Sequence, residues 1–131
     1  MVDTNVLVAA LIKPDGRVAP VVVALREGRF KLLYSRATLE ELVDVLSRPW
    51  LKDKYAVTDE GVEALLKLVL LRGEEVEVTL AVELSRDPTD DEFLAVAIVG
   101  EARYLVNRDL RDLGGHGSVE IVSPARFLEE I

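Results

Sequence analysis

The chain has 131 residues, half of them hydrophobic, and a net charge of −8, which fits one domain over residues 1–131 with a single hydrophobic core. It contains no cysteine, which excludes disulfide bonds, zinc–thiolate sites and a cysteine nucleophile. No hydrophobic run approaches the roughly 18–20 residues that span a bilayer, and the N-terminus does not resemble a signal peptide, so we expect a cytoplasmic protein without membrane contact.

The first half of the chain is expected to alternate short strands with helices. The opening VDTNVLVAAL predicts a short buried strand that runs directly into a loop or helix, with Asp3 in the strand or at its exit. Ser35 and Thr58 are typical N-caps, and Pro49 is expected to end the helix that Ser35 begins. The elements predicted after the opening are a helix over residues 18–27, a strand over 30–34, a helix over 36–46 and a helix that reaches residues 72–73.

The second half continues the alternation. Its clearest start signal is Asp87 as an N-cap, with Pro88 at the first helical position and Asp90 at the third. The predicted elements are a half-exposed strand over residues 74–78, a helix over 88–99, a strand over 103–106, a helical turn over 109–113, a strand over 120–122 and a terminal helix from residue 124. This order predicts an α/β fold, a three-layer α/β/α sandwich around a mainly parallel central sheet.

Four acidic residues come from four different elements of this pattern. Asp3 lies at the first strand, Asp109 follows the strand over residues 103–106, Asp90 begins a helix and Glu41 lies within one. Because sites in α/β sheets form at the carboxyl ends of the strands, these acids can converge at one edge. Mg²⁺ and Mn²⁺ prefer such oxygen ligands, and two ions about 4 Å apart can promote phosphodiester hydrolysis.

Each acid also has a structural interpretation. Glu41 can belong to a solvated helix surface, Asp90 can be the third residue of a capping box, and Asp109 can cap a short helical turn. Asp3 is harder to explain in this way, because a carboxylate in an apolar strand needs a partner. The functional interpretation therefore rests on the four acids as a set.

Several segments, taken in order, resemble the PIN-domain nucleases, particularly their stand-alone toxin-like branch in bacteria and archaea. They are VDTNVLVAAL, SRATLEELVDVLSRP, DPTDDEFLAVA, and YLVNRDLRDL followed by IVSPARFL, and they cover nearly the whole chain. The resemblance implies a ribonuclease that uses Mg²⁺ or Mn²⁺ to hydrolyse RNA phosphodiester bonds. It also raises the expectation of a toxin role, an antitoxin protein as partner, and a homodimer.

The resemblance assigns roles to individual residues. Asp3, Asp90 and Asp109 would bind metal ions, and Glu41 would bind a metal ion or position the attacking water. Supporting roles are expected for five further polar residues, namely Asn5, Ser35, Asp91, Asn107 and Asp112. Asn107 departs from the family pattern, which usually has Thr at this position.

Two of these assignments choose between adjacent acids. Glu41 is preferred to Glu40 because the family pattern places its acid directly before Leu-x-x-Val-Leu. Asp90 is preferred to Asp91 because of the spacing to the following Ala-x-Ala at residues 95–97. Each choice predicts which of two neighbouring carboxylates is essential.

Other functions are also compatible with parts of the pattern. A phosphohydrolase with Asp3 as nucleophile would usually have a second Asp two residues later, where this chain has Asn5. A receiver-like domain would need a late lysine, and no lysine follows Lys67. A PIN fold that only binds RNA would be favoured by the loss of a carboxylate, and none of the four is missing.

The charge distribution is unusual for a protein that binds RNA. Residues 1–54 hold nine Lys and Arg against seven Asp and Glu, and residues 55–131 hold seven against seventeen, giving net charges of +2 and −10. Phosphate contacts normally need Lys and Arg. We interpret Trp50, Tyr55 and Tyr104 as packing residues rather than base-stacking platforms, and most basic side chains as ordinary solvated surface.

Overall fold

Helices make up most of the part of the chain that the computed structural model describes, which is residues 1–78, 88–107 and 119–131, with the backbone alone for residues 88–92. The helices and strands of this part run in the order α1 (Thr4–Ile12), α2 (Ala19–Arg26), β1 (Leu32–Tyr34), α3 (Arg36–Leu46), α4 (Pro49–Tyr55), α5 (Asp59–Arg72), β2 (Gly73–Glu75), α6 (Pro88–Val99), β3 (Tyr104–Val106), β4 (Glu120–Val122) and α7 (Pro124–Glu130). No helix within these ranges is long and apolar enough to cross a bilayer.

The strands pair in parallel. β1 pairs with β2 over all three of their residues, and β3 pairs with β4 with Leu105 opposite Ile121. Val2 forms a single parallel bridge with Val106, so the start of the chain lies beside β3. Parallel neighbours need long crossover connections, and α3, α4 and α5 provide the one between β1 and β2. The predicted α/β sandwich with parallel strands is confirmed.

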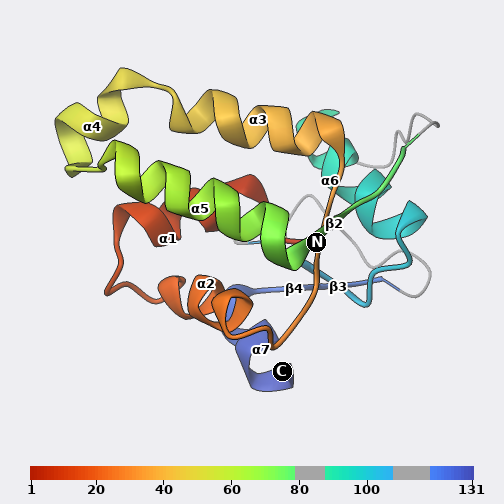
Figure 1. Ribbon diagram of the computed structural model, residues 1–131. Helices are drawn as coiled ribbons and strands as arrows, with labels where there is room; N and C mark the ends of the chain where they lie inside the picture. The colour runs from red at the N-terminus through yellow and green to blue at the C-terminus, as the bar shows by residue number, and fades with distance from the viewer. Residues whose placement is uncertain (79–87, 108–118) are drawn as a thin grey trace.

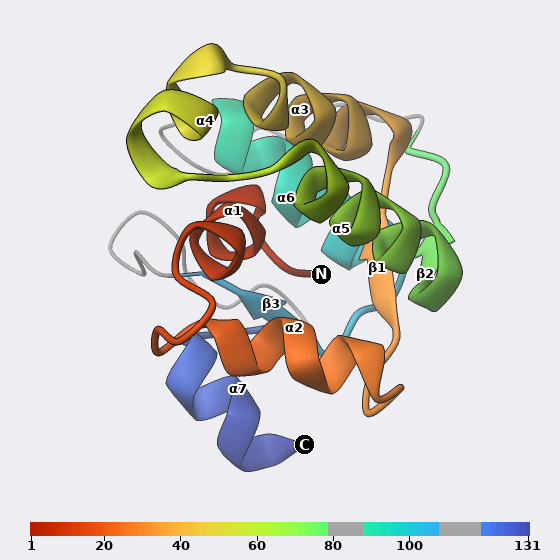
Figure 2. The same ribbon diagram turned by 60° about the vertical axis from the view of Figure 1, so that its left-hand side comes forward.

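Helices cover the strands from two sides. In both Figure 1 and Figure 2, α2 and α7 lie on one side of β3 and β4, whereas α1, α3, α4 and α5 lie on the other. α6 packs against α3, β1 and β3. This arrangement places α3 and α6, which carry two of the predicted acids, against each other.

α1 is buried on nearly all sides. Val6, Leu7 and Ala10 are each less than a tenth exposed, and the helix packs against α2, α3 and α5. A helix that is hydrophobic all round belongs in the interior of a protein. Because α1 begins at Thr4, its burial also fixes the position of Asp3, the residue directly before it.

Helices with a clear N-cap follow the sequence-based expectation closely. α3 begins after Ser35, α5 after Thr58 and α7 after Ser123, and each cap side chain accepts a hydrogen bond from a backbone N–H of its helix. Such a cap satisfies an N–H group that has no partner inside the helix. The strand predicted over residues 74–78 is shorter and begins one residue earlier, as β2.

Two features differ from the expectation. The sequence pattern does not predict α4, because Pro49 is interpreted only as the end of a helix; here it takes the first position of a new one, where a missing N–H costs nothing. The predicted first strand is reduced to the bridge at Val2, because Asp3 already caps α1. The predicted cap Asp87 and the predicted helical turn over residues 109–113 lie outside the described residues.

Candidate metal-binding site

Asp3 lies at the junction between the bridge and α1. Its backbone N–H donates to the carbonyl of Val106 at 2.9 Å, and its Oδ1 accepts from the backbone N–H of Asn5 at 3.0 Å. The residue is only 4% exposed. A buried carboxylate requires hydrogen bonds or a cation to compensate for its lost hydration, and the N–H of Asn5 provides one such bond.

Asn107 holds the other oxygen of the same carboxylate. Its Nδ2 donates to Oδ2 of Asp3 at 2.7 Å, and its own backbone N–H donates to the carbonyl of Val122 in β4 at 2.9 Å. Asn107 is 3% exposed and directly follows β3. A carboxylate can accept about four hydrogen bonds, so bonds from Asn107 and Asn5 orient Asp3 and are compatible with its acting as a metal ligand.

Glu41 reaches the same region from α3. The hydroxyl of Thr4, the first residue of α1, donates to Oε2 of Glu41 at 3.5 Å. Thr4 is 4% exposed, and Glu41 is half-buried where α1 packs against α3. The structure therefore brings Asp3 and Glu41, which are 38 residues apart in the sequence, to either side of Thr4.

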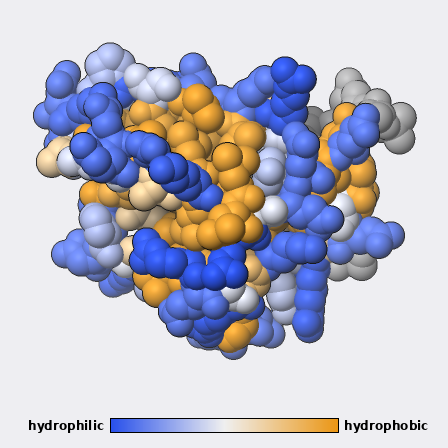
Figure 3. Space-filling view, viewed as in Figure 1, coloured by the Kyte–Doolittle hydropathy of each residue, from blue (hydrophilic) through white to orange (hydrophobic). Residues whose placement is uncertain are grey.

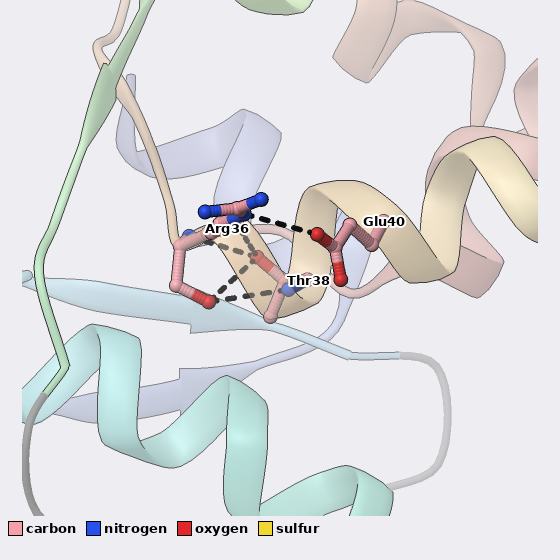
Figure 4. Close-up of polar contacts among 4 residues, drawn as sticks. Arg36, Thr38 and Glu40 are labelled. Carbon is pink, nitrogen blue, oxygen red and sulfur yellow. Dashed lines mark hydrogen bonds and ion pairs between the residues drawn. The ribbon is translucent and has the colours of Figure 1, made fainter.

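Glu40 points to a different place from Glu41. Its Oε1 accepts from Nε of Arg36 at 3.1 Å on the exposed side of α3 (Figure 4), and its side chain is 68% exposed. An exposed i,i+4 pair of this kind contributes little to stability. Its position supports the choice of Glu41 over Glu40 as the acid of the site.

The other predicted acids are only partly described. Asp90 and Asp91 lie in the first turn of α6, whose side chains are not described there, and Asp109 and Asp112 lie outside the described residues. Among the side chains that the structure does describe, no three acids or histidines form a group that could hold a metal ion. The donor set of Asp3 and Glu41 consists of carboxylate oxygens, which suits Mg²⁺ or Mn²⁺.

Comparison with known proteins identifies the fold family. A family model described as PIN domain matches residues 1–111. The chain belongs to the PIN-domain family. Searches of curated proteins and of solved structures each returned no match. PIN domains are generally metal-dependent nucleases that act on nucleic acids.

The match to the PIN domain spans all four predicted acids. It begins at residue 1 and ends at residue 111, so it includes Asp3, Glu41, Asp90 and Asp109 but not β4 or α7. Within this range, sequence reasoning missed Thr4, whose buried hydroxyl contacts Glu41. The signal was present, since a polar Asp-Thr-Asn triplet is unexpected at the start of an otherwise hydrophobic segment.

Ser35 is the N-cap of α3, the helix that carries Glu41. Its Oγ accepts from the backbone N–H of Thr38 at 3.1 Å, and Thr38 Oγ1 accepts from the backbone N–H of Ser35 at 2.9 Å, a reciprocal capping box (Figure 4). Both residues are buried. The box fixes the first turn of the helix that carries Glu41, so Ser35 acts through the helix.

Ser35→Ala is expected to lower the free energy of unfolding by about 1 kcal/mol, because the backbone N–H of Thr38 loses the Oγ of Ser35 as its acceptor. Ser47→Ala is the matched control, since Ser47 is exposed at the other end of α3 and its hydroxyl donates to the carbonyl of Val43. Chemical denaturation of both variants measures the difference. Equal stability of the two would contradict the structural role of the capping box.

Proposed function

We propose that this PIN domain is a Mg²⁺- or Mn²⁺-dependent endoribonuclease. Asp3, Asp90 and Asp109 are the proposed metal ligands, and Glu41 is a ligand or positions the attacking water. The observation that carries the proposal is the buried carboxylate of Asp3, oriented by Asn107, next to Thr4, whose hydroxyl contacts Glu41. Asn5, Asp91 and Asp112 have proposed supporting roles.

Neighbouring polar groups contact the proposed metal ligands Asp3 and Glu41. Asn107 and the N–H of Asn5 keep the carboxylate of Asp3 in one orientation, which lowers the cost of forming a precise site. The hydroxyl of Thr4 makes a longer contact, 3.5 Å, with Oε2 of Glu41. When bound, a divalent ion activates water and stabilises the leaving oxygen of the phosphodiester. Burial of Asp3 strengthens its attraction for such a cation, because the local dielectric is low.

Two other functions have less support. A phosphohydrolase would need the carboxylate of Asp3 as an open nucleophile, whereas this carboxylate is 4% exposed and accepts hydrogen bonds at both oxygens. A non-catalytic RNA-binding regulator would need no oriented buried acid at all. The retention of Asp3 and its partners therefore favours the nuclease over both.

The direct test is cleavage of RNA by the purified protein. Single-stranded RNA should be cut in the presence of Mn²⁺ or Mg²⁺ at low ionic strength, and EDTA should stop the reaction. Binding of the ion should also raise the melting temperature, since a ligand at 100 times its Kd stabilises the folded state by about 2.7 kcal/mol. A protein that neither cleaves RNA nor melts at a higher temperature with millimolar Mn²⁺ would not be the proposed enzyme.

Self-association is part of the proposal and has support from the surface of α3 and α5. Figure 3 shows hydrophobic residues gathered over these two helices, where Val43, Leu70 and Leu71 are 41%, 55% and 75% exposed. Residues 36–72 hold six Lys and Arg against seven Asp and Glu, so a second copy would meet little repulsion there. Exposed apolar patches of this kind are typical of protein interfaces, which supports a homodimer.

We further propose that the protein acts in the cytoplasm as the toxin of a toxin–antitoxin pair. An antitoxin would block the acidic site and so protect cellular RNA. A small open reading frame next to the gene is the observation that would support this assignment.

A further inference from the structure

Trp50 is an exposed aromatic residue on α4. The chain has seven aromatic residues, all within the part that the structure describes, and Trp50 alone is exposed, at 42%. Its ring packs edge-on against Tyr55, with centroids 5.7 Å apart and an interplanar angle of 72°. Tyr55 thus supports the indole on one side. Sequence reasoning assigns Trp50 to packing, whereas the structure leaves much of the ring accessible.

The residues next to Trp50 in the sequence are rich in basic side chains, although the protein as a whole is acidic. Arg48, Lys52 and Lys54 outnumber Asp53, which gives residues 48–55 a charge of +2 in a chain of net charge −8. Lys54 lies over the ring of Tyr55, with Nζ 5.5 Å from its centroid. Hydrophilic residues cover the surface around α4 at the upper left of Figure 3. A single tryptophan among cations has the chemistry of a base-stacking site.

The basic side chains Arg48 and Lys52 can exchange their carboxylate partners for phosphate oxygens. Nη2 of Arg48 contacts Asp44 at 3.1 Å, and Lys52 pairs with Asp59, but all four of these side chains are at least half exposed. Exposed ion pairs contribute little to stability, so a phosphate oxygen can replace the carboxylate at low cost. Arg and Lys contacts of this kind supply most of the affinity for a nucleic-acid backbone.

Another basic stretch lacks the exposed ring. Residues 26–36 contain four Lys and Arg against one Glu, but their aromatic residue, Phe30, packs edge-on against Phe127 with centroids 4.9 Å apart. Phe30 is half-buried by this contact. The combination of an open ring with neighbouring cations therefore distinguishes α4 from this stretch.

We propose that α4, together with its N-cap Arg48, is a docking surface for single-stranded RNA. One base stacks on Trp50, and the adjacent phosphates contact Arg48, Lys52 and Lys54. The proposal rests on the proposed function and adds to it a contact with the RNA outside the metal site. α3 leads from Glu41 to α4, so a strand that follows α3 away from the site reaches this surface (Figure 1). An unpaired strand is required, because bases inside a duplex cannot stack on a side chain.

The single tryptophan provides a direct reporter of this contact. A short single-stranded RNA of mixed sequence is titrated into the wild-type protein in EDTA, which prevents cleavage, while tryptophan emission and RNA anisotropy are recorded together. Emission should be quenched with the same midpoint as the anisotropy change. Trp50→Ala should bind roughly 5- to 150-fold more weakly, the range for loss of one base–aromatic stack, and Trp50→Phe should recover part of the affinity.

Charge is tested separately with a matched pair of variants. Arg48→Ala should reduce the slope of log affinity against log salt by about 0.7, the contribution of one phosphate contact on a single strand. Arg126→Ala is the control, because it also removes one exposed arginine from an i,i+4 ion pair, but on α7, across the strands from α4. Equal effects of the two arginine variants would overturn the phosphate contacts at α4.

The remaining outcomes separate this proposal from the nuclease assignment. RNA binding without a change in Trp50 emission, together with normal affinity of Trp50→Ala, would overturn the docking surface even if cleavage is observed. Quenching without cleavage in Mn²⁺ would support the docking surface and reject the nuclease. Emission that changes with protein concentration, in step with dimerisation measured by sedimentation and without dependence on RNA, would assign Trp50 to contact with a second copy and overturn the proposal.

Discussion

Replacement of Asp3 by Asn is expected to lower the rate of RNA cleavage by roughly 100- to 1000-fold, the usual effect of removing one group that stabilises a transition state electrostatically. The substitution keeps the size of the side chain and an oxygen that can still cap α1 by accepting from the N–H of Asn5. The negative charge is lost, and with it a ligand for the metal ion. The rate at saturating Mn²⁺ and the circular dichroism spectrum should show an inactive but folded protein.

Glu41→Gln and Glu40→Gln provide the matched comparison for Asp3→Asn. Glu41 lies in the candidate site beside Thr4, whereas the adjacent Glu40 pairs with Arg36 on the exposed side of α3. Glu41→Gln should therefore lose activity, and Glu40→Gln should retain it. If wild-type protein and Asp3→Asn show the same residual cleavage, the activity belongs to a contaminating nuclease, and the RNA-binding regulator becomes the better assignment.

Asn107→Leu is expected to weaken metal binding and activity by roughly 10- to 100-fold, the usual effect of removing a group that orients a metal ligand. The variant removes the N–H that holds Oδ2 of Asp3 at 2.7 Å, but it leaves the charge of Asp3 in place. Asn107 is thus a positioning residue. The apparent Kd for Mn²⁺, measured from the dependence of melting temperature on ion concentration, reports this role independently of cleavage.

Asn107→Thr is the conservative counterpart. A threonine hydroxyl can donate to Asp3, and Thr is the residue that the PIN-domain pattern usually has at this position, so most of the metal affinity should return. If Leu and Thr at residue 107 give the wild-type Kd for Mn²⁺, the bond to Asp3 has no part in metal binding. If both fail equally, the amide itself is required.

The parts of the fold with local signals could be predicted from the sequence. Ser35 and Thr58 mark the starts of α3 and α5 because the cap is a contact between residues three positions apart. The sequence does not predict α4, because Pro49 is compatible both with the end of one helix and with the start of the next. Local chemistry at Pro49 does not distinguish these outcomes, and packing of the buried Leu51 decides between them.

The candidate site could be predicted only in part, because its contacts are not local. The rule that sites form at the carboxyl ends of strands anticipates that Asp3 lies near the residues after β3. It does not specify that the amide of Asn107 donates to Oδ2 of Asp3, or that Thr4 lies between Asp3 and Glu41. These contacts depend on where α1 packs against α3, which is a property of the folded interior.

The link between Asn107 and Asp3 also bears on when the candidate site becomes ordered during synthesis of the chain. The two residues are 104 positions apart, and Asn107 is itself held by Val122 of β4. A chain emerging from the ribosome exposes Asp3 early but cannot orient it until Asn107 and β4 have been translated, because contacts this distant in sequence form late. The candidate site therefore stays unordered in every nascent chain that ends before β4.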